Sequence, residues 1–327
     1  MPVGWSRRRF LGSTAAAAAA ATLGYPLSAQ AKTSQAGNVG RFSIGIQSYS
    51  LRGFSVEDAV RHSHELGFAH IEFYSAHFSQ DSTPAEIAGM KKSMSDAGMK
   101  MLGHGVHSFS ADHEANRRLF EFARAVGLRC MSADPSPDSF ESLDRLVKEF
   151  DIRIAIHNHG PGHRYNKAID VLGAYEPYDQ RIGACADLGH YIRSGEDAVQ
   201  VIRLLGDRLY GIHLKDFADM RKETRGVILG EGHLDVEGVF AALARVNFPA
   251  DGCLSLEYEE NEADPIDDIR QCMAIARKAA AQVSGQFASQ SPSQTVTGAA
   301  VSKPCLSPPT RRRKYCRPYR SRRRGGG

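Results

Sequence analysis

Residues 152–162 read IRIAIHNHGPG, an apolar run that ends in two histidines and then turns through Gly160, Pro161 and Gly162. The β-branched residues and the turn predict a β-strand. Side chains two residues apart lie on the same face of a strand, so His157 and His159 would share a face at its carboxyl end. A functional site and a strand end with two solvated histidines both fit this stretch, and the remaining strands distinguish between them.

Similar short β-like runs recur between residues 42 and 283, and each is followed by a helical pattern. Such alternation is typical of parallel βα units. Eight units in about 240 residues predict an α/β fold, a (β/α)8 TIM barrel in a single domain. An open doubly wound sheet is the alternative, but it needs no eighth strand and usually carries a glycine-rich phosphate turn. The expected strands are 42–48, 70–74, 100–106, 129–133, 153–158, 182–188, 209–214 and 253–258, and the expected helices are 56–66, 84–97, 114–126, 139–150, 166–175, 196–205, 236–246 and 265–281.

The last four strands alternate between small or polar residues and bulky aliphatic ones. We expect the small and polar side to face the barrel interior and the aliphatic side to lie under the helices. Each of these strands then brings one ionisable side chain to the carboxyl-terminal mouth, where TIM barrel enzymes keep their chemistry. The four side chains are His157, Asp187, His213 and Glu257.

Two imidazoles and two carboxylates form a mixed nitrogen and oxygen ligand set. Such a set suits Mn²⁺, Co²⁺, Fe²⁺ or Zn²⁺ better than Ca²⁺ or Mg²⁺, which prefer oxygen ligands. We therefore predict that these four residues bind one divalent metal ion. A hydrogen-bonded polar mouth without metal is the alternative, although unpaired charges are expensive to gather there.

The two ends of the chain differ from the part between them. The start holds Ser6-Arg7-Arg8-Arg9-Phe10-Leu11, an alanine-rich run and Ala29-Gln30-Ala31, which predicts a twin-arginine-type signal peptide over residues 1–31 and a periplasmic or otherwise exported protein. An uncleaved membrane anchor is the alternative, but the apolar run is short for one. Residues 32–41 are read as a linker. Residues 284–327 are read as a disordered basic tail, which either binds nucleic acid or an acidic surface or is not native sequence.

Charge and cysteine usage exclude several classes of protein. Without the four basic residues through Lys32 and the ten from Lys303 onward, the net charge changes from +4 to −10. An acidic body argues against a folded nucleic-acid-binding domain. The six cysteines contain no C-x-x-C pair, so neither a disulfide framework nor a zinc knuckle is indicated. We expect a small-molecule partner and no stable membrane insertion after signal removal, and the oligomeric state stays open.

Five segments resemble the xylose isomerase-like TIM barrel family of sugar isomerases and epimerases, and the resemblance covers nearly all of residues 42–281. They are IAIHNHGPGH (154–163), CADLGHYIRSGED (185–197), LYGIHLKDF (209–217), LGEGHLD (229–235) and LSLEYE (254–259). The resemblance implies metal ligands at Asp187, His213 and Glu257. His157 stands where typical epimerases have a glutamate that shares proton transfer with the eighth-strand glutamate. Histidine can still bind the metal at this position, but the two-glutamate mechanism cannot be assumed.

The resemblance also implies roles for other residues at the mouth. His190 and Lys215 would contact substrate oxygens, and His159 would face the substrate. Glu231 lies in the glycine-flexed loop of LGEGHLD, where a substrate-binding lid would close. The expected catalytic residues are Glu257, which is both ligand and possible base, and the free candidates His104 and Glu72.

These features predict a metal-dependent sugar isomerase or epimerase-like enzyme. It would act on a sugar or keto-sugar by proton abstraction next to a carbonyl, through a metal-stabilised enediolate. The altered fifth strand and the export signal also fit a lyase, hydratase or hydrolase of 3-keto-glycosides. A noncatalytic sugar-binding protein is a third reading. Apurinic endonucleases use the same barrel, but their extra ligands and basic face are not evident here.

Overall fold

The computed structural model of the 327-residue chain describes residues 37–289. The predicted signal peptide lies outside this range, as does the predicted tail beyond Ser289. Within it, residues 37–288 form one compact unit. The prediction of a single-domain α/β barrel is confirmed by its sheet and its helices.

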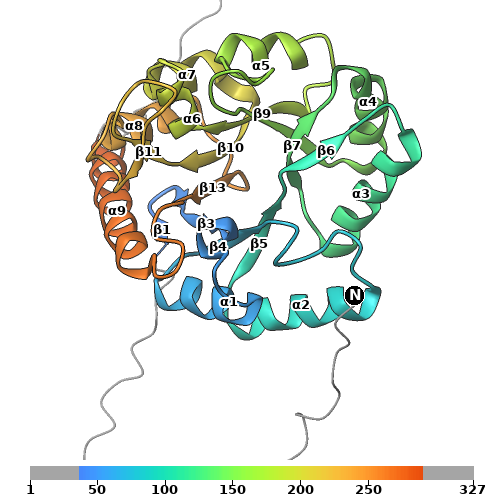
Figure 1. Cartoon of the computed structure of the whole chain (residues 1–327), viewed down its shortest axis with the longest axis horizontal. Coiled ribbons are helices and arrows are strands. Elements are labelled where there is room, and N and C mark those ends of the chain that lie inside the picture. The colour runs from blue at the N-terminus through green and yellow to red at the C-terminus, as the bar shows by residue number, and fades with distance from the viewer. Residues whose placement is uncertain (1–36, 290–327) are drawn as a thin grey trace, which may run out of the picture. The chain divides into compact units, whose positions relative to one another are not determined.

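Nine strands form one sheet, in the order β5-β4-β3-β13-β10-β9-β8-β7-β6. The registers of all eight pairings are parallel. Figure 1 shows the strands at the centre of a ring of helices. The strand bounds are β3 Gly45–Gln47, β4 His70–Phe73, β5 Lys100–His104, β6 His107–Phe109, β7 Cys130–Pro135, β8 Arg153–His157, β9 Ile182–Asp187, β10 Leu209–Leu214 and β13 Cys253–Leu256.

The third βα unit supplies both edges of this sheet. The predicted strand 100–106 is β5, which ends at His104 and pairs with β4. The sequence did not predict β6, which follows at 107–109 and pairs with β7. The chain passes from one edge to the other through Gly105 and Val106, close to β7. A Cβ atom on Gly105 would lie only 2.3 Å from the Ser132 carbonyl oxygen, and φ there is +152°. Glycine therefore allows the third unit to close the barrel.

Helices surround the strands, and each of the eight predicted helices is present with shifted ends. The sequence did not predict the short helix α6, which directly follows β9. No helix within residues 37–289 has both the length and the apolar character of a membrane span. The helix bounds are α1 Val56–Glu65, α2 Pro84–Asp96, α3 His113–Val126, α4 Phe140–Phe150, α5 Ala168–Tyr175, α6 Leu188–Arg193, α7 Ala198–Leu205, α8 Val236–Arg245 and α9 Ile266–Ser289.

Two predicted boundaries need correction. In the predicted linker, β1 (Asn38–Val39) pairs antiparallel with β2 (Phe42–Ser43). At the other end, α9 continues to Ser289, and Phe287 packs against the core. The predicted tail therefore begins too early, because an apolar contact keeps the last turns of α9 on the barrel.

The two faces of the strands differ as predicted. Ile154 and Ile156 of β8 are fully buried in the main core, whereas Ala155 packs in a separate small cluster with Cys130 and Cys185. Cβ atoms are also absent at Gly103, Gly183 and Gly211, where a built Cβ would lie within 3 Å of neighbouring atoms. Small residues thus leave room inside the barrel for the polar side chains described next.

Candidate active site

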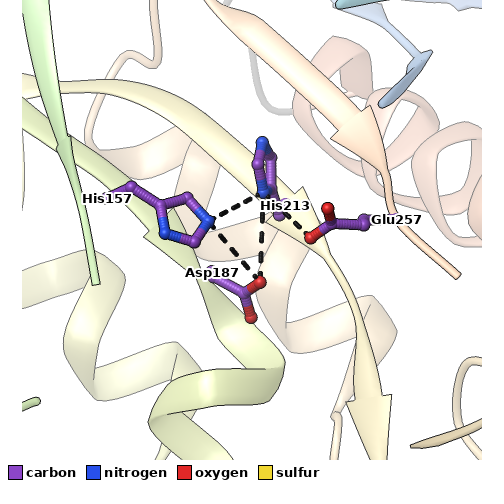
Figure 2. A group of neighbouring side chains, drawn as sticks. All are labelled: His157, Asp187, His213 and Glu257. Atoms are coloured by element: carbon purple, nitrogen blue, oxygen red, sulfur yellow. Dashed lines mark hydrogen bonds and ion pairs between the residues drawn. The ribbon is translucent and has the colours of Figure 1, made fainter. Parts of the chain in front are cut away.

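Four ionisable side chains converge at the carboxyl ends of neighbouring strands. His157 and Asp187 end β8 and β9, His213 is the next-to-last residue of β10, and Glu257 directly follows β13. Each offers a ligand atom within 4.8 Å of the others, and all four residues are buried. Figure 2 shows them pointing toward one another. The mouth cluster, as we call His157, Asp187, His213 and Glu257, therefore has the geometry that the sequence predicted.

The spacing within the mouth cluster fits a bound ion. His213 Nδ1 lies 3.1 Å from both His157 Nε2 and Glu257 Oε2. Asp187 Oδ2 lies 3.7 Å from His157 Nε2 and 3.9 Å from His213 Nδ1. Ligand atoms about 2.0–2.2 Å from a shared metal ion are roughly 3–3.5 Å apart. Two facing ring nitrogens need either a shared proton or an ion between their lone pairs. The mixed nitrogen and oxygen donors suit Mn²⁺, Co²⁺, Fe²⁺ or Zn²⁺.

Asp187 is held in place by its surroundings. Its Oδ1 accepts the His190 backbone N–H at 2.7 Å and so caps α6, which leaves Oδ2 facing the cluster. Asn158 binds the Asp187 backbone on both sides, donating to its carbonyl at 3.0 Å and accepting its N–H at 2.8 Å. The role of Asn158 escaped the sequence analysis, although its place between two mouth histidines was a signal.

Lys215 lies against the carboxylates of the site. Its Nζ is 3.2 Å from Asp187 Oδ2, 3.0 Å from Glu257 Oε2 and 2.8 Å from Glu259 Oε1. Burial opposes its charge, but these carboxylates raise the pKa of Lys215 above its usual value. The side chain thus acts as a buried counter-ion, and the predicted contact with substrate oxygens stays a prediction.

An open pocket of about 390 Å³ borders the mouth cluster, since His157 and Glu257 line it. This volume is within the range of small-molecule sites. His159 and His190, two of the predicted substrate-binding residues, also line it, and the Nδ1 atom of each is buried without a partner among the described residues. The other lining residues, which the sequence analysis missed, are Gln47, Tyr49, Tyr74, Ser75, Gly105, Val106 and Glu259.

A model of a known family matches residues 60–279, and its description is xylose isomerase-like TIM barrel. The chain belongs to this family.

Among curated relatives, the chain is 27% identical over 175 residues to a 3-oxo-isoapionate decarboxylase from Pectobacterium atrosepticum. That match covers 48% of this chain and 61% of the relative. It is 30% identical over 138 residues to an inosose dehydratase from Clostridium tetani, covering 37% of this chain and 45% of the relative. The chain therefore spans about half the length of the curated relatives that it matches.

Solved structures share the barrel fold. A D-tagatose 3-epimerase-like protein is 15% identical with a TM-score of 0.60, over 75% of this chain and 100% of that one. The 3-keto-D-glucoside 4-epimerase from E. coli is 17% identical with a TM-score of 0.58, over 72% of this chain and 99% of that one. The named relatives of this family member thus include epimerases, a dehydratase and a decarboxylase.

In this barrel, Glu72 is not a free base. Only 1% of its surface is exposed, and it does not line the pocket. Its Oε2 lies 3.0 Å from His213 Nε2 and accepts from Ser255 Oγ at 2.9 Å, while Oε1 accepts from Ser132 Oγ at 2.7 Å. The prediction that Glu72 takes a substrate proton is therefore wrong, because the side chain points into the barrel interior below the cluster.

His104 also lies away from the mouth of the barrel. It packs on the outer side of the sheet against Phe78 and Phe122. Its Nε2 lies 2.8 Å from the Phe78 carbonyl oxygen, and its Nδ1 lies 2.9 Å from His107 Nε2. Burial lowers the pKa of His104 to about 4. The structure contradicts the prediction of a catalytic His104, since Gly103, not His104, occupies the inward position of β5.

Glu231 is exposed and does not line the pocket. Its loop is instead held by Asp216, the first residue of the short strand β11 (Asp216–Phe217), which pairs with β12 (Gly226–Val227). The Asp216 carboxylate accepts backbone N–H groups at 2.8–3.0 Å from Gly230, Gly232, His233 and Leu234. The predicted substrate contact of Glu231 has no support in this geometry, and the loop is fastened to the barrel.

A second group of possible ligands, Asp134, His159 and His163, lies beside the pocket. His163 Nδ1 accepts the Tyr165 backbone N–H at 3.2 Å, so the ring proton must be on Nε2. That nitrogen lies 3.2 Å from Asp134 Oδ2, to which it donates. The tautomer of His163 thus suits a hydrogen bond to Asp134 better than a second metal.

Proposed function

We propose that this protein is an exported, metal-dependent enzyme that abstracts a proton next to the carbonyl of a sugar or keto-sugar. The observation that carries the proposal is the mouth cluster, four ligand atoms within 4.8 Å of one another beside an open pocket. The names of its relatives support an enzyme of this kind, since they include epimerases, a dehydratase and a decarboxylase.

A divalent ion bound by the mouth cluster would polarise the substrate carbonyl and stabilise negative charge on the neighbouring oxygens. Glu257 lines the pocket. Burial opposes its ionisation, but Lys215 and His213 hold its pKa well below the usual value. The ionised carboxylate is thus placed to accept the substrate proton, and it alone of the three expected catalytic residues lines the pocket.

The side chains around the pocket would orient the substrate. Burial lowers the pKa of His159 and, further, that of His190, so both rings are neutral near pH 7 and can donate or accept a hydrogen bond. Their buried Nδ1 atoms have no partner within the described residues. A substrate with several hydroxyl groups offers partners to such atoms, which is why we propose a sugar rather than an apolar substrate.

Isomerisation or epimerisation is the leading reaction, and the resemblance to epimerases supports it. The alternative is a lyase, hydratase or hydrolase acting on a 3-keto-glycoside, and His157 favours it. By the resemblance, this ring of the mouth cluster stands where the two-base mechanism needs a second carboxylate. A single carboxylate base beside a metal is sufficient for elimination after proton abstraction.

Exchange of a substrate proton with solvent deuterium tests the proposal. The metal-loaded enzyme should exchange the α-proton of a ketose or a 3-keto-glycoside, and Glu257→Gln should slow this exchange by about 100-fold or more. Glu262→Gln is the matched control, because that side chain is 62% exposed and pairs with Arg52. Tight sugar binding that chelation leaves unchanged, without any exchange, would instead identify a sugar-binding protein.

The proposed export signal has a separate test. Replacing Arg7 and Arg8 by lysine together keeps the charge but removes the arginine pair. We expect the wild-type protein in the exported fraction of a host with a twin-arginine pathway and the double variant in the cytoplasm. Equal distribution of both proteins would contradict this route.

A further inference from the structure

The inference concerns Glu72, a buried carboxylate that the proposed chemistry does not use. The two ring nitrogens of His213 face different groups. Nδ1 faces the mouth cluster, and Nε2 lies 3.0 Å from Glu72 Oε2. Both residues are at most 1% exposed. Because a carboxylate can only accept, Nε2 of His213 carries a proton, and Nδ1 is the ring nitrogen left to bind an ion. Nδ1 points at His157 Nε2 and Glu257 Oε2.

Glu72 is itself held by donors from several strands. Ser132 of β7 and Ser255 of β13 donate to it at 2.7 and 2.9 Å, and Cys253 Sγ lies 3.3 Å from Oε2. These donors and His213 contact both carboxylate oxygens, so the carboxylate is fixed in orientation, as a residue that orients another must be.

The second histidine of the cluster lacks such support. His157 presents Nε2 to the cluster, but its Nδ1 is buried with no hydrogen-bond partner among residues 37–289. Metal-binding histidines usually donate their other N–H to a carboxylate, carbonyl or water, which fixes the ring and raises its basicity. In the described part of the chain, His213 has this arrangement and His157 does not.

Charge balance points the same way. The buried groups in and next to the cluster are the carboxylates Glu72, Asp187 and Glu257 and the ammonium of Lys215. With neutral histidines they carry an excess of two negative charges, which a divalent cation would neutralise. The part-exposed Glu259, 2.8 Å from Lys215 Nζ, adds a further negative charge. Loss of the charge of Glu72 would therefore weaken the attraction for a cation without removing it.

We propose that Glu72 is the positioning residue of the metal centre, which holds His213 with its proton on Nε2, presents Nδ1 to the ion and strengthens binding through its own charge. This inference rests on the metal centre of the proposed function, and it replaces the catalytic role that the sequence suggested for Glu72.

Metal affinity tests the proposal without any activity assay. The full-length protein would be stripped with a chelator and titrated with Mn²⁺, while the free ion is followed by electron paramagnetic resonance. We expect Glu72→Gln to weaken Mn²⁺ binding by about 10–100-fold. Ser132→Ala is the matched control, because it removes a donor to Oε1 and leaves the contact of Oε2 with His213. Its affinity should stay within roughly threefold of the wild type.

A second readout separates positioning from a purely structural role. Nitrogen NMR of the ¹⁵N-histidine-labelled, chelated protein, with His213 assigned from His213→Gln, should show a slowly exchanging proton on Nε2 in the wild type. In Glu72→Gln this proton should exchange faster with solvent. A variant that melts earlier but binds Mn²⁺ as the wild type does would overturn the proposal.

Two outcomes remain for this experiment. If Glu72→Gln does not fold, Glu72→Asp keeps the charge and withdraws it from His213; weaker Mn²⁺ binding then supports the proposal, and unchanged binding refutes it. If the wild type itself binds no Mn²⁺, Zn²⁺, Co²⁺ or Fe²⁺, the metal centre is absent and the proposed function fails together with this inference.

Discussion

Two of the contacting histidine pairs in the described part of the barrel join different strands, and their surroundings differ. His104 and His107 stack with an angle of 12° and are packed with Phe78, Phe109 and Phe122. His157 and His213 meet at a similar nitrogen separation, 3.1 Å against 2.9 Å, but Asp187 and Glu257 complete their group. The first pair, which we call the outer pair, lies away from the pocket. His157 of the second pair, which we call the mouth pair, lines the pocket.

The difference teaches that neighbours, rather than the histidines themselves, determine the chemistry. Around the outer pair, burial lowers the pKa of His107 to about 3 and that of His104 to about 4, so both rings stay neutral and pack. Around the mouth pair, carboxylates supply the negative charge that a cation needs. The predictions that follow test this contrast.

The largest expected effect is the loss of the metal from the mouth pair. His213→Ala removes a ligand and leaves Glu72 buried with one fewer donor, so Mn²⁺ affinity should fall by more than about 100-fold. Metal analysis by plasma mass spectrometry should find about one equivalent in the wild type and in His104→Ala. If His104→Ala lost the metal while His213→Ala kept it, the contrast would be reversed.

A smaller loss is expected for the other member of the mouth pair. His157→Ala removes a ligand whose far nitrogen has no partner in the described structure. Its Mn²⁺ affinity should therefore fall by about 10–100-fold, less than for His213→Ala. The same titration gives both values, and equal losses would show that support from Glu72 adds nothing.

The outer pair should affect stability through pH. The unfolded chain binds protons on these histidines below about pH 6.5, whereas the folded chain does so only near pH 4 or lower. Stability is therefore lost as the pH falls from 6.5 toward 4, by about 2 kcal/mol per histidine at pH 5. Glu72 is the charged group that acts on both rings.

His104→Gln isolates this effect. Urea unfolding with chelator present, at pH 7 and pH 5, should show about 2 kcal/mol less acid destabilisation in the variant than in the wild type. Chelation removes the contribution of metal release. Identical acid destabilisation in both proteins would mean that His104 is not kept neutral by burial.

The smallest effect is expected at Glu231, which belongs to neither pair. Its side chain is exposed and lies outside the pocket lining. Glu231→Ala should change the free energy of unfolding by no more than about 0.5 kcal/mol and leave Mn²⁺ affinity unaltered. A large loss of substrate binding in this variant would restore the lid contact that the sequence suggested.

Periodicity was enough to predict the barrel and the mouth cluster. Inward residues of β8, β9, β10 and β13 alternate with aliphatic ones, and a period of two assigns each side chain to a face. Four ionisable residues at equivalent ends could therefore be brought together from the sequence. Their roles are still to be tested.

Periodicity does not show how far along the barrel axis a side chain lies, or at which residue a short strand ends. Glu72 has the inward face but lies below the mouth, where β4 pairs with Gly103 of β5. His104 is one residue further along and so faces outward with Phe73, its partner in the register. The split of the third strand at Gly105 depends on contact with Ser132, which is distant in sequence. No local pattern carries that information.

The split third strand also has a mechanical consequence. Strand pairing is continuous from β6 through β13 to β5, and the barrel closes across Gly105 and Val106 instead of through a ladder. We expect a closed sheet that lacks ladder hydrogen bonds at one position to deform first at that position. Gly105 and Val106 line the pocket together with His157 and Glu257, which lie at the ends of strands that pair on both sides. We therefore expect the pocket to adapt to a ligand at Gly105 and Val106 before the mouth cluster moves.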